Sequence, residues 1–184
     1  MNVVITHETL FRRRIAHVEH FLRPIRRQPH VHCQFYRPQY GGGKVLASHD
    51  GESDTSDFHS WRCRTTKKEL WFTYFELWKE TTDRATWFLD RAYFHLYRAD
   101  RDTRSLVQIL GVHADPNCTD AMPLRLLKRG PHVHVLMAEE PLPACHFPLN
   151  FGHLQNVLSS SPRFTRAIRD AVQVLADDVI VRFA

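Results

Sequence analysis

The chain has 184 residues, of which 43% are hydrophobic and 24% are charged, and its formal net charge is +5. This length and composition suffice for one hydrophobic core, and they exclude a disordered or fibrous chain. Residues 1–5 do not resemble a secretory signal, and no apolar run reaches the length of a membrane span. We therefore expect a soluble, cytoplasmic protein that makes no membrane contact and forms a single domain over residues 1–184.

The first predicted element is a helix over residues 8–23, because its apolar residues recur close to every 3.6 positions. Arginines lie on and just beyond this helix, mostly off the apolar stripe: Arg12, Arg13, Arg14, Arg23, Arg26 and Arg27. Arginine makes bidentate contacts with phosphate, so this segment predicts binding to the phosphate backbone of nucleic acid. A solvated helix surface, or docking on an acidic protein partner, are the alternatives.

The middle of the chain predicts β-structure. Residues 30–36 read as a short strand. The aromatic-rich runs 69–79 and 86–98, followed by 105–112, indicate an antiparallel meander, although the first two runs also fit a helix plus a strand. A loop over 113–130, a strand over 131–137, a segment around His146, and helices from 152 and from Ser161-Pro162 follow. The predicted class is α+β, with an N-terminal helix, a central antiparallel sheet and C-terminal helices packed on one face.

Histidines supply the candidate chemistry. The tetrapeptide Pro-His-Val-His occurs at residues 29–32 and again at 131–134. Residues two apart on a strand share a face, so His132 and His134 should present two imidazoles side by side. With His146 they form the predicted catalytic set, because imidazole acts as base or acid near pH 7. The same three histidines with Glu139 form an alternative site for a divalent transition metal.

Two known patterns match this region only in part. Paired histidines on two strands are the arrangement of the 2H phosphoesterases, but His32 and His134 occupy the positions where that family has a hydroxyl residue. The pattern His132-x-His134 with Glu139, followed by His146-x-x-x-Asn150, matches parts of the cupin metal motif. The six residues between the two halves are too few for the strands that a cupin places there.

A third pattern covers about a third of the chain. It consists of Tyr93-Phe94-His95-Leu96-Tyr97, Val112-His113-Ala114-Asp115, His132-Val133-His134, Glu139-Glu140-Pro141 and Phe147. In this order of pieces the stretch from Tyr93 to Phe151 resembles small bacterial proteins of the TumE toxin–antitoxin type. The resemblance implies a bacterial toxin or defence role, acting on RNA, with an antitoxin as protein partner.

The leading hypothesis is therefore a ribonuclease-like protein whose arginines hold the backbone while His132 and His134 act at the phosphate. His113, beside Asp115, is a further candidate for the same site, whereas His95 is interpreted as an ordinary surface or core residue. The alternatives are a non-catalytic adaptor that docks through the basic helix, and a His/Glu metal-binding protein.

Overall fold

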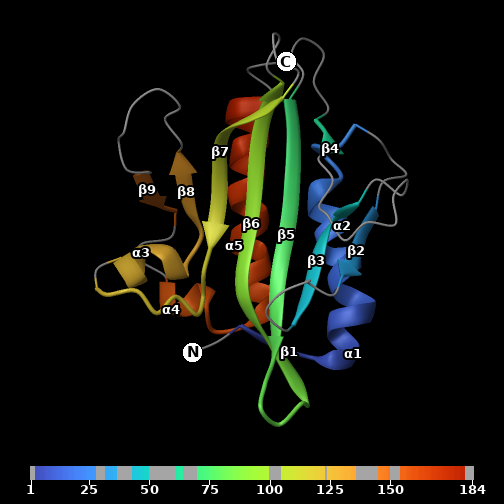
Figure 1. Cartoon of the computed structure of the whole chain (residues 1–184), viewed down its shortest axis with the longest axis vertical. Helices are drawn as coiled ribbons and strands as arrows, with labels where there is room; N and C mark the ends of the chain where they lie inside the picture. The colour runs from blue at the N-terminus through green and yellow to red at the C-terminus, as the bar shows by residue number, and fades with distance from the viewer. Residues whose placement is uncertain are drawn as a thin grey trace.

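The computed structural model describes residues 3–27, 32–36, 43–49, 61–63, 70–99, 105–122, 124–135, 145–149 and 154–180. Within these ranges, nine strands form one antiparallel sheet whose main path runs β2-β3-β5-β6-β7-β8-β9, while β1 pairs with β6 and β4 with β5 (Figure 1). The strands are β1 (Val4–Thr6), β2 (His32–Tyr36), β3 (Lys44–His49), β4 (Trp61–Arg62), β5 (Leu70–Glu80), β6 (Thr86–Ala99), β7 (Leu106–Ala114), β8 (His132–Val135) and β9 (Cys145–Pro148).

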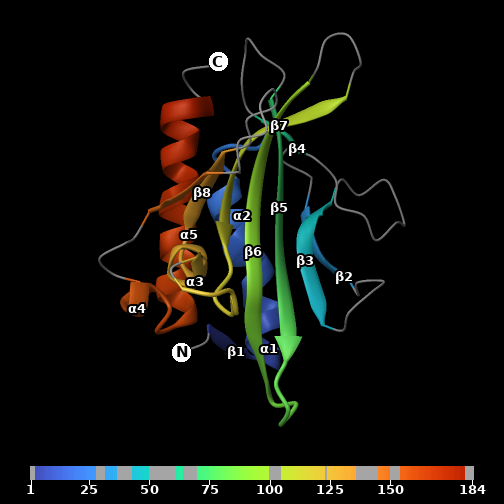
Figure 2. The same cartoon turned by 60° about the vertical axis from the view of Figure 1, so that its left-hand side comes forward.

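The helices come before β2 and after β7 in the sequence. The N-terminal segment runs through α1 (His7–Thr9), a π-helical turn η1 (Leu10–Arg14) and α2 (Ile15–Leu22). Later come α3 (Leu124–Arg129), α4 (Leu154–Val157), α5 (Ser161–Leu175) and a second π-helical turn, η3 (Ala176–Ile180). Helices α2 and α5 lie on the same side of the sheet (Figure 2). The predicted α+β class, with its N-terminal helix, antiparallel sheet and C-terminal helices, is confirmed.

Alternation along the long strands gives the sheet two different faces. On β5 the side chains of Leu70, Phe72 and Tyr74 are buried and belong to the same core as α2 and α5. We call this the helix face of the sheet. Helix α5 contributes residues spaced three and four apart, among them Phe164 and Ile168, as expected for an amphipathic helix. The opposite face, which we call the outer face, carries the intervening residues of each strand.

The strands of the meander were predicted, and the short strands β2 and β8 lie within the strands predicted at 30–36 and 131–137, but other short elements were missed. The described parts of the runs predicted at 69–79 and 86–98 are both strands, β5 and β6, which removes the helix-plus-strand alternative. Strands β1, β3 and β4 were missed, and α3 lies inside the predicted loop over 113–130. Elements this short show too little periodicity to be recognised, because their neighbours in space define them. No helix in the described ranges is long and apolar enough to cross a membrane.

Candidate functional site: a histidine cluster on the outer face of the sheet

Histidines from three adjacent strands meet on the outer face. On β6, Phe94 and Leu96 point into the core, so His95 lies on the other side. The strand register pairs His95 with Gly111 of β7, and Gly111 with His134 of β8. One row along, His113 of β7 pairs with His132 of β8. We refer to His95, His113, His132 and His134 as the histidine cluster.

The rings of the cluster touch one another. The Nε2 atoms of His95 and His113 are 2.8 Å apart, which is hydrogen-bond distance. One of these nitrogens donates and the other accepts, so the two rings adopt complementary tautomers. The ring centroid of His113 lies 4.7 Å from that of His134 and 5.8 Å from that of His132. His113 is therefore the centre of the cluster.

Gly111 provides the space in which these rings meet. A Cβ atom at this position would lie 2.8 Å from Nε2 of His113 and 3.0 Å from Cδ2 of His95. Any larger residue would push against both rings, because ordinary carbon contacts are longer than this. Because Gly111 has no side chain, the ring of His113 can cross its own strand and reach His95.

Two tyrosines hold the cluster in place. Tyr93 stacks on His113 with ring centroids 4.1 Å apart and an interplanar angle of 20°. Its hydroxyl donates to Oδ1 of Asp115 at 2.6 Å. On the far side, the Tyr97 hydroxyl lies 3.3 Å from Nδ1 of His95. These contacts fix the orientations of His113 and His95.

Burial changes the acidity of these groups. Burial, and to a smaller extent the charge of His134, lower the pKa of His95 from its ordinary value of 6.5 to about 4. Burial also raises the pKa of Asp115, and burial together with the hydrogen bond to Asp115 raises that of Tyr93. His95 is therefore a neutral imidazole near pH 7, and a proton on His134 helps to keep it so.

His132 differs from its neighbours because its side chain has no exposed surface. Its Nδ1 lies 2.9 Å from the carbonyl oxygen of Gly130, to which it donates. His132 and His134 share a face of β8, as their spacing predicts, but the complete burial of His132 makes their environments unequal. His134 keeps partial exposure. Within the cluster, the ring of His132 packs edge-on against that of His113. Because His132 has no exposed surface, it is not placed to contact a substrate directly.

The remaining members of the predicted set are defined only in part. The register pairs His146 of β9 with His134, which extends the row His95–Gly111–His134 by one strand. The side chain of His146 and all of Glu139 lie outside the described residues. Within the described residues, no group of three or more His, Cys, Asp or Glu side chains is arranged to hold a metal ion. A metal site involving Glu139 and His146 stays a prediction.

The basic helix does not adjoin the histidine cluster. Arg12, Arg13, Arg23 and Arg27 are exposed, and Arg26 is half-buried. Their segment packs on the helix face, whereas the cluster lies on the outer face. The predicted division of labour, in which the arginines hold the backbone while the histidines act at a phosphate, would therefore require contacts on two sides of the sheet.

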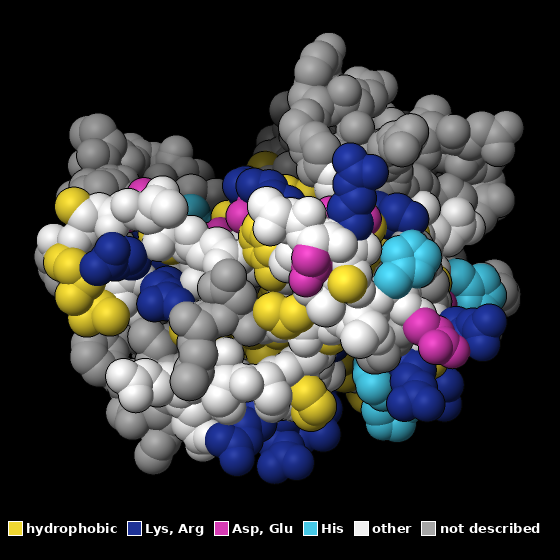
Figure 3. Space-filling view, turned by 90° about the horizontal axis from the view of Figure 1, so that it is seen from below, with side chains coloured by type: hydrophobic (Ala, Val, Ile, Leu, Met, Phe, Trp, Pro, Cys, Tyr) yellow, Lys and Arg dark blue, Asp and Glu magenta, His cyan; other side chains and the backbone are white. Residues whose placement is uncertain are grey.

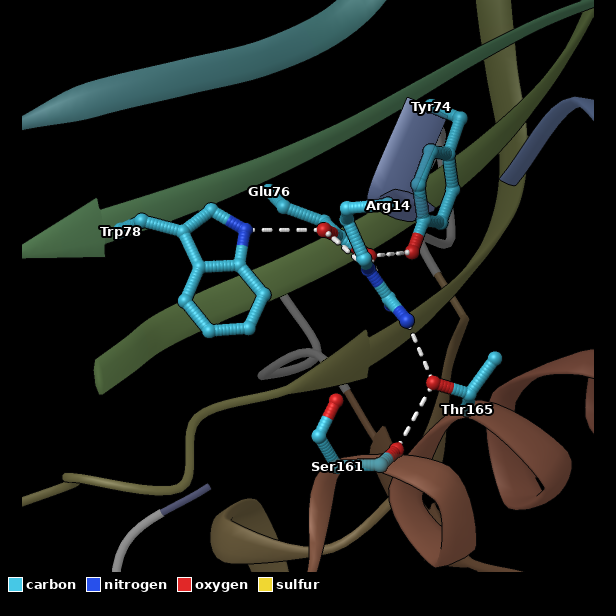
Figure 4. Close-up of polar contacts among 6 residues, drawn as sticks. All are labelled: Arg14, Tyr74, Glu76, Trp78, Ser161 and Thr165. Atoms are coloured by element: carbon cyan, nitrogen blue, oxygen red, sulfur yellow. Dashed lines mark hydrogen bonds and ion pairs between the residues drawn. The ribbon is translucent and has the colours of Figure 1, made fainter. Parts of the chain in front are cut away.

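Arg14 is a core residue, which contradicts its predicted role in binding nucleic acid. It is 2% exposed, and its Nε donates to the two carboxylate oxygens of Glu76 at 2.9 and 3.1 Å. Figure 4 shows this carboxylate also receiving hydrogen bonds from Tyr74 and Trp78, while the guanidinium reaches Thr165 of α5. Arg14 therefore joins the first helical segment to β5 and α5, and it is not available to a phosphate.

The two Pro-His-Val-His segments lie far apart. His32 is on β2, and four strands separate β2 from β8 in the sheet. Its imidazole faces Glu19, with Nδ1 3.2 Å from a carboxylate oxygen. The single groove with histidines from both segments, as in the 2H phosphoesterases, is therefore not formed. His30 lies outside the described residues.

Sequence reasoning missed His95, Tyr93 and Gly111. The alternation Tyr93, His95, Tyr97 within one predicted strand was the available signal, since it places three polar rings on the same face. Comparisons offer no further guidance, because the chain has no significant match among family models, curated proteins or solved structures. The resemblance to TumE-type proteins stays a prediction.

Proposed function

We propose that the histidine cluster is an acid–base site that cleaves the phosphodiester backbone of single-stranded RNA. The observation that supports this most directly is the contact between Nε2 of His95 and Nε2 of His113, with His134 alongside. These are adjacent imidazoles in unequal environments. Such a difference separates the pKa values of neighbouring groups, which assigns one as base and another as acid.

The roles follow from the electrostatics. His113, hydrogen-bonded to the neutral His95, is the base that removes the proton from a ribose 2′-hydroxyl. The 2′-oxygen then forms its bond to phosphorus while the bond from phosphorus to the 5′-oxygen breaks. His134, protonated, donates its proton to that leaving oxygen. The products are a 2′,3′-cyclic phosphate and a free 5′-hydroxyl, so no other reactant is required.

The decisive experiment is cleavage of labelled RNA by the purified chain in the presence of EDTA. We expect cleavage of RNA but not of DNA or 2′-O-methyl RNA of the same sequence, because both lack the attacking hydroxyl. His113→Ala and His134→Ala should each reduce the rate by about 10²- to 10⁴-fold. The matched control is His32→Ala, which removes a histidine four strands away and should leave the rate unchanged.

Three outcomes would overturn this proposal: no RNA cleavage at all, full activity in both cluster variants, or equal cleavage of DNA. Loss of activity in EDTA with recovery on adding one transition ion would favour the metal alternative over metal-independent chemistry.

A second function is favoured by the position of the basic helix. Its exposed arginines lie on the other side of the sheet from the cluster, which suits an adaptor that docks on an acidic protein such as an antitoxin. A chain that shows no cleavage but loses a protein partner on charge reversal of Arg12 and Arg13 would support this function instead.

A further inference from the structure

Two helical segments that are joined by a hydrogen bond on the helix side of the sheet both carry exposed arginines. Helix α5 exposes Arg163, Arg166 and Arg169, which are spaced three apart and so form one stripe. The hydrogen bond from Arg14 to Thr165 ties η1, which carries Arg12 and Arg13, to the beginning of α5. We refer to Arg12, Arg13, Arg163 and Arg166 as the arginine surface. The three α5 arginines played no part in the sequence-based prediction.

This surface keeps much of its positive charge. Within the described residues it makes one ion pair, from Arg12 to Glu8 at 3.4 Å, in which both side chains are more than three-quarters exposed, while Asp170 of α5 pairs with Arg169. An exposed pair of this kind is screened by water and salt. Arg163 donates to the neutral side chains of Asn156 and Ser159. In Figure 3, which views this end from below, Lys and Arg side chains stand out in groups along the rim.

We propose that RNA binds on two sides of the molecule, its backbone held by the arginine surface while a distant phosphodiester reaches the histidine cluster. This inference rests on the proposed function for its second half only. Guanidinium groups on neighbouring helix turns suit a run of phosphates, because each forms bidentate contacts and remains charged at all relevant pH values.

The two surfaces cannot share a phosphate. A helix with its side chains is about 10 Å in diameter, and the arginine surface lies on the solvent side of α5 while the cluster lies beyond the sheet. A bound strand must therefore pass around the end or edge of the sheet to occupy both. The consequence is a dependence on substrate length: a dinucleotide fills the cluster alone, whereas a long strand gains contacts at both surfaces.

The test combines binding and cleavage. Binding of a long single-stranded RNA and of a dinucleotide is measured over a range of salt concentrations, using the His134→Ala chain so that the RNA stays intact. Arg13→Glu with Arg166→Glu should weaken binding of the long RNA at least tenfold at low salt. The salt dependence should also become shallower, because fewer counterions are released. In the otherwise unchanged chain, the same pair should leave dinucleotide cleavage within twofold.

The matched control is Arg98→Glu with Arg125→Glu, which makes the same change in charge at exposed positions on β6 and α3. It should have a much smaller effect on long RNA. Equal weakening by both pairs, or no weakening by the first, would overturn the two-sided arrangement. So would a parallel loss of dinucleotide cleavage in the Arg13/Arg166 variant. Failure of the proposed function is distinguishable, since it would appear as absent cleavage while the arginine-dependent binding persists.

Discussion

The sheet carries a polar cluster on each face, one around Glu76 of β5 and the other on β6, β7 and β8, and the two clusters differ in chemistry and in burial. On the helix face, Arg14 and Glu76 form an ion pair that is almost completely buried. On the outer face, His95, His113 and His134 form a group of partly exposed imidazoles. One cluster consists of a buried ion pair, and the other consists of imidazoles, of which His95 has a pKa lowered to about 4.

The difference shows which cluster is structural. Burying a charge is costly unless a partner and hydrogen bonds compensate it, and Glu76 has both, from Arg14, Tyr74 and Trp78. With all its polar atoms engaged within the core, this network fixes how the first helix and α5 meet the sheet. The imidazoles of His95 and His113 hydrogen-bond to each other, and transfer of one proton would exchange donor and acceptor. Groups that can exchange protons in this way are typical of catalytic sites.

The largest expected effect concerns the buried pair. Replacing Glu76 by Ala leaves the guanidinium of Arg14 in the core without its counter-charge, so the free energy of unfolding should fall by about 3–5 kcal/mol. Denaturant titration measures this directly. The double variant Arg14→Met with Glu76→Leu should recover much of the loss, because it removes both charges together. A loss below about 1 kcal/mol in Glu76→Ala would show that the pair does not carry the structural role.

We expect Gly111→Ala to lower the free energy of unfolding less than Glu76→Ala does, and to disturb the histidine cluster directly. The new methyl group would meet His113 and His95 and force their Nε2 atoms apart. Adjusting two side chains costs about 1 kcal/mol or slightly more, whereas the hydrogen bond between the rings should be lost. RNA cleavage should then fall at least tenfold, and the imidazole NMR signals of both residues should shift.

The control for this variant is Val112→Ala, next in sequence but on the helix face, where Val112 is 1% exposed. It creates a small cavity and should cost at least as much stability while leaving the imidazole signals in place. If Val112→Ala alters the cluster as much as Gly111→Ala does, Gly111 has no special role in bringing the rings together.

The fold was predictable wherever a pattern extended over many residues. Strands β5 and β6 have 11 and 14 residues, long enough for their aromatic and aliphatic content to identify them. Strand β3 and helix α3 have six residues each, and the interactions that define them come from partners elsewhere in the chain. Arg14 was assigned to the wrong environment for the same reason, because its partner Glu76 lies 62 residues away.

The site was predictable in part. The spacing of His132 and His134 correctly placed both on one face of a strand. The central position of His113 and the participation of His95 depend on how β6, β7 and β8 align, and a shift of one residue would send these side chains to the other face. No local pattern determines that register. The role of Gly111 becomes evident only from the strand pairing that places it between His95 and His134.

The finest test of the comparison is the pH dependence of stability. The pKa of His95 is about 4 in the folded chain and 6.5 when unfolded, so between these values the unfolded chain binds a proton that the folded chain does not. The free energy of unfolding must therefore fall as pH decreases from 6.5 to 4, by at most about 1.4 kcal/mol per pH unit from this residue. Above 6.5 both states are neutral at His95, and its contribution is constant. Denaturant titrations at pH 4.5, 5.5 and 7.5 should show a shallower dependence in His95→Gln than in the unmodified chain, whereas His32→Gln should keep the original dependence. Identical profiles for all three chains would mean that His95 accepts a proton as readily as an exposed histidine, and the contrast between a neutral His95 and a charged inner pair would not hold.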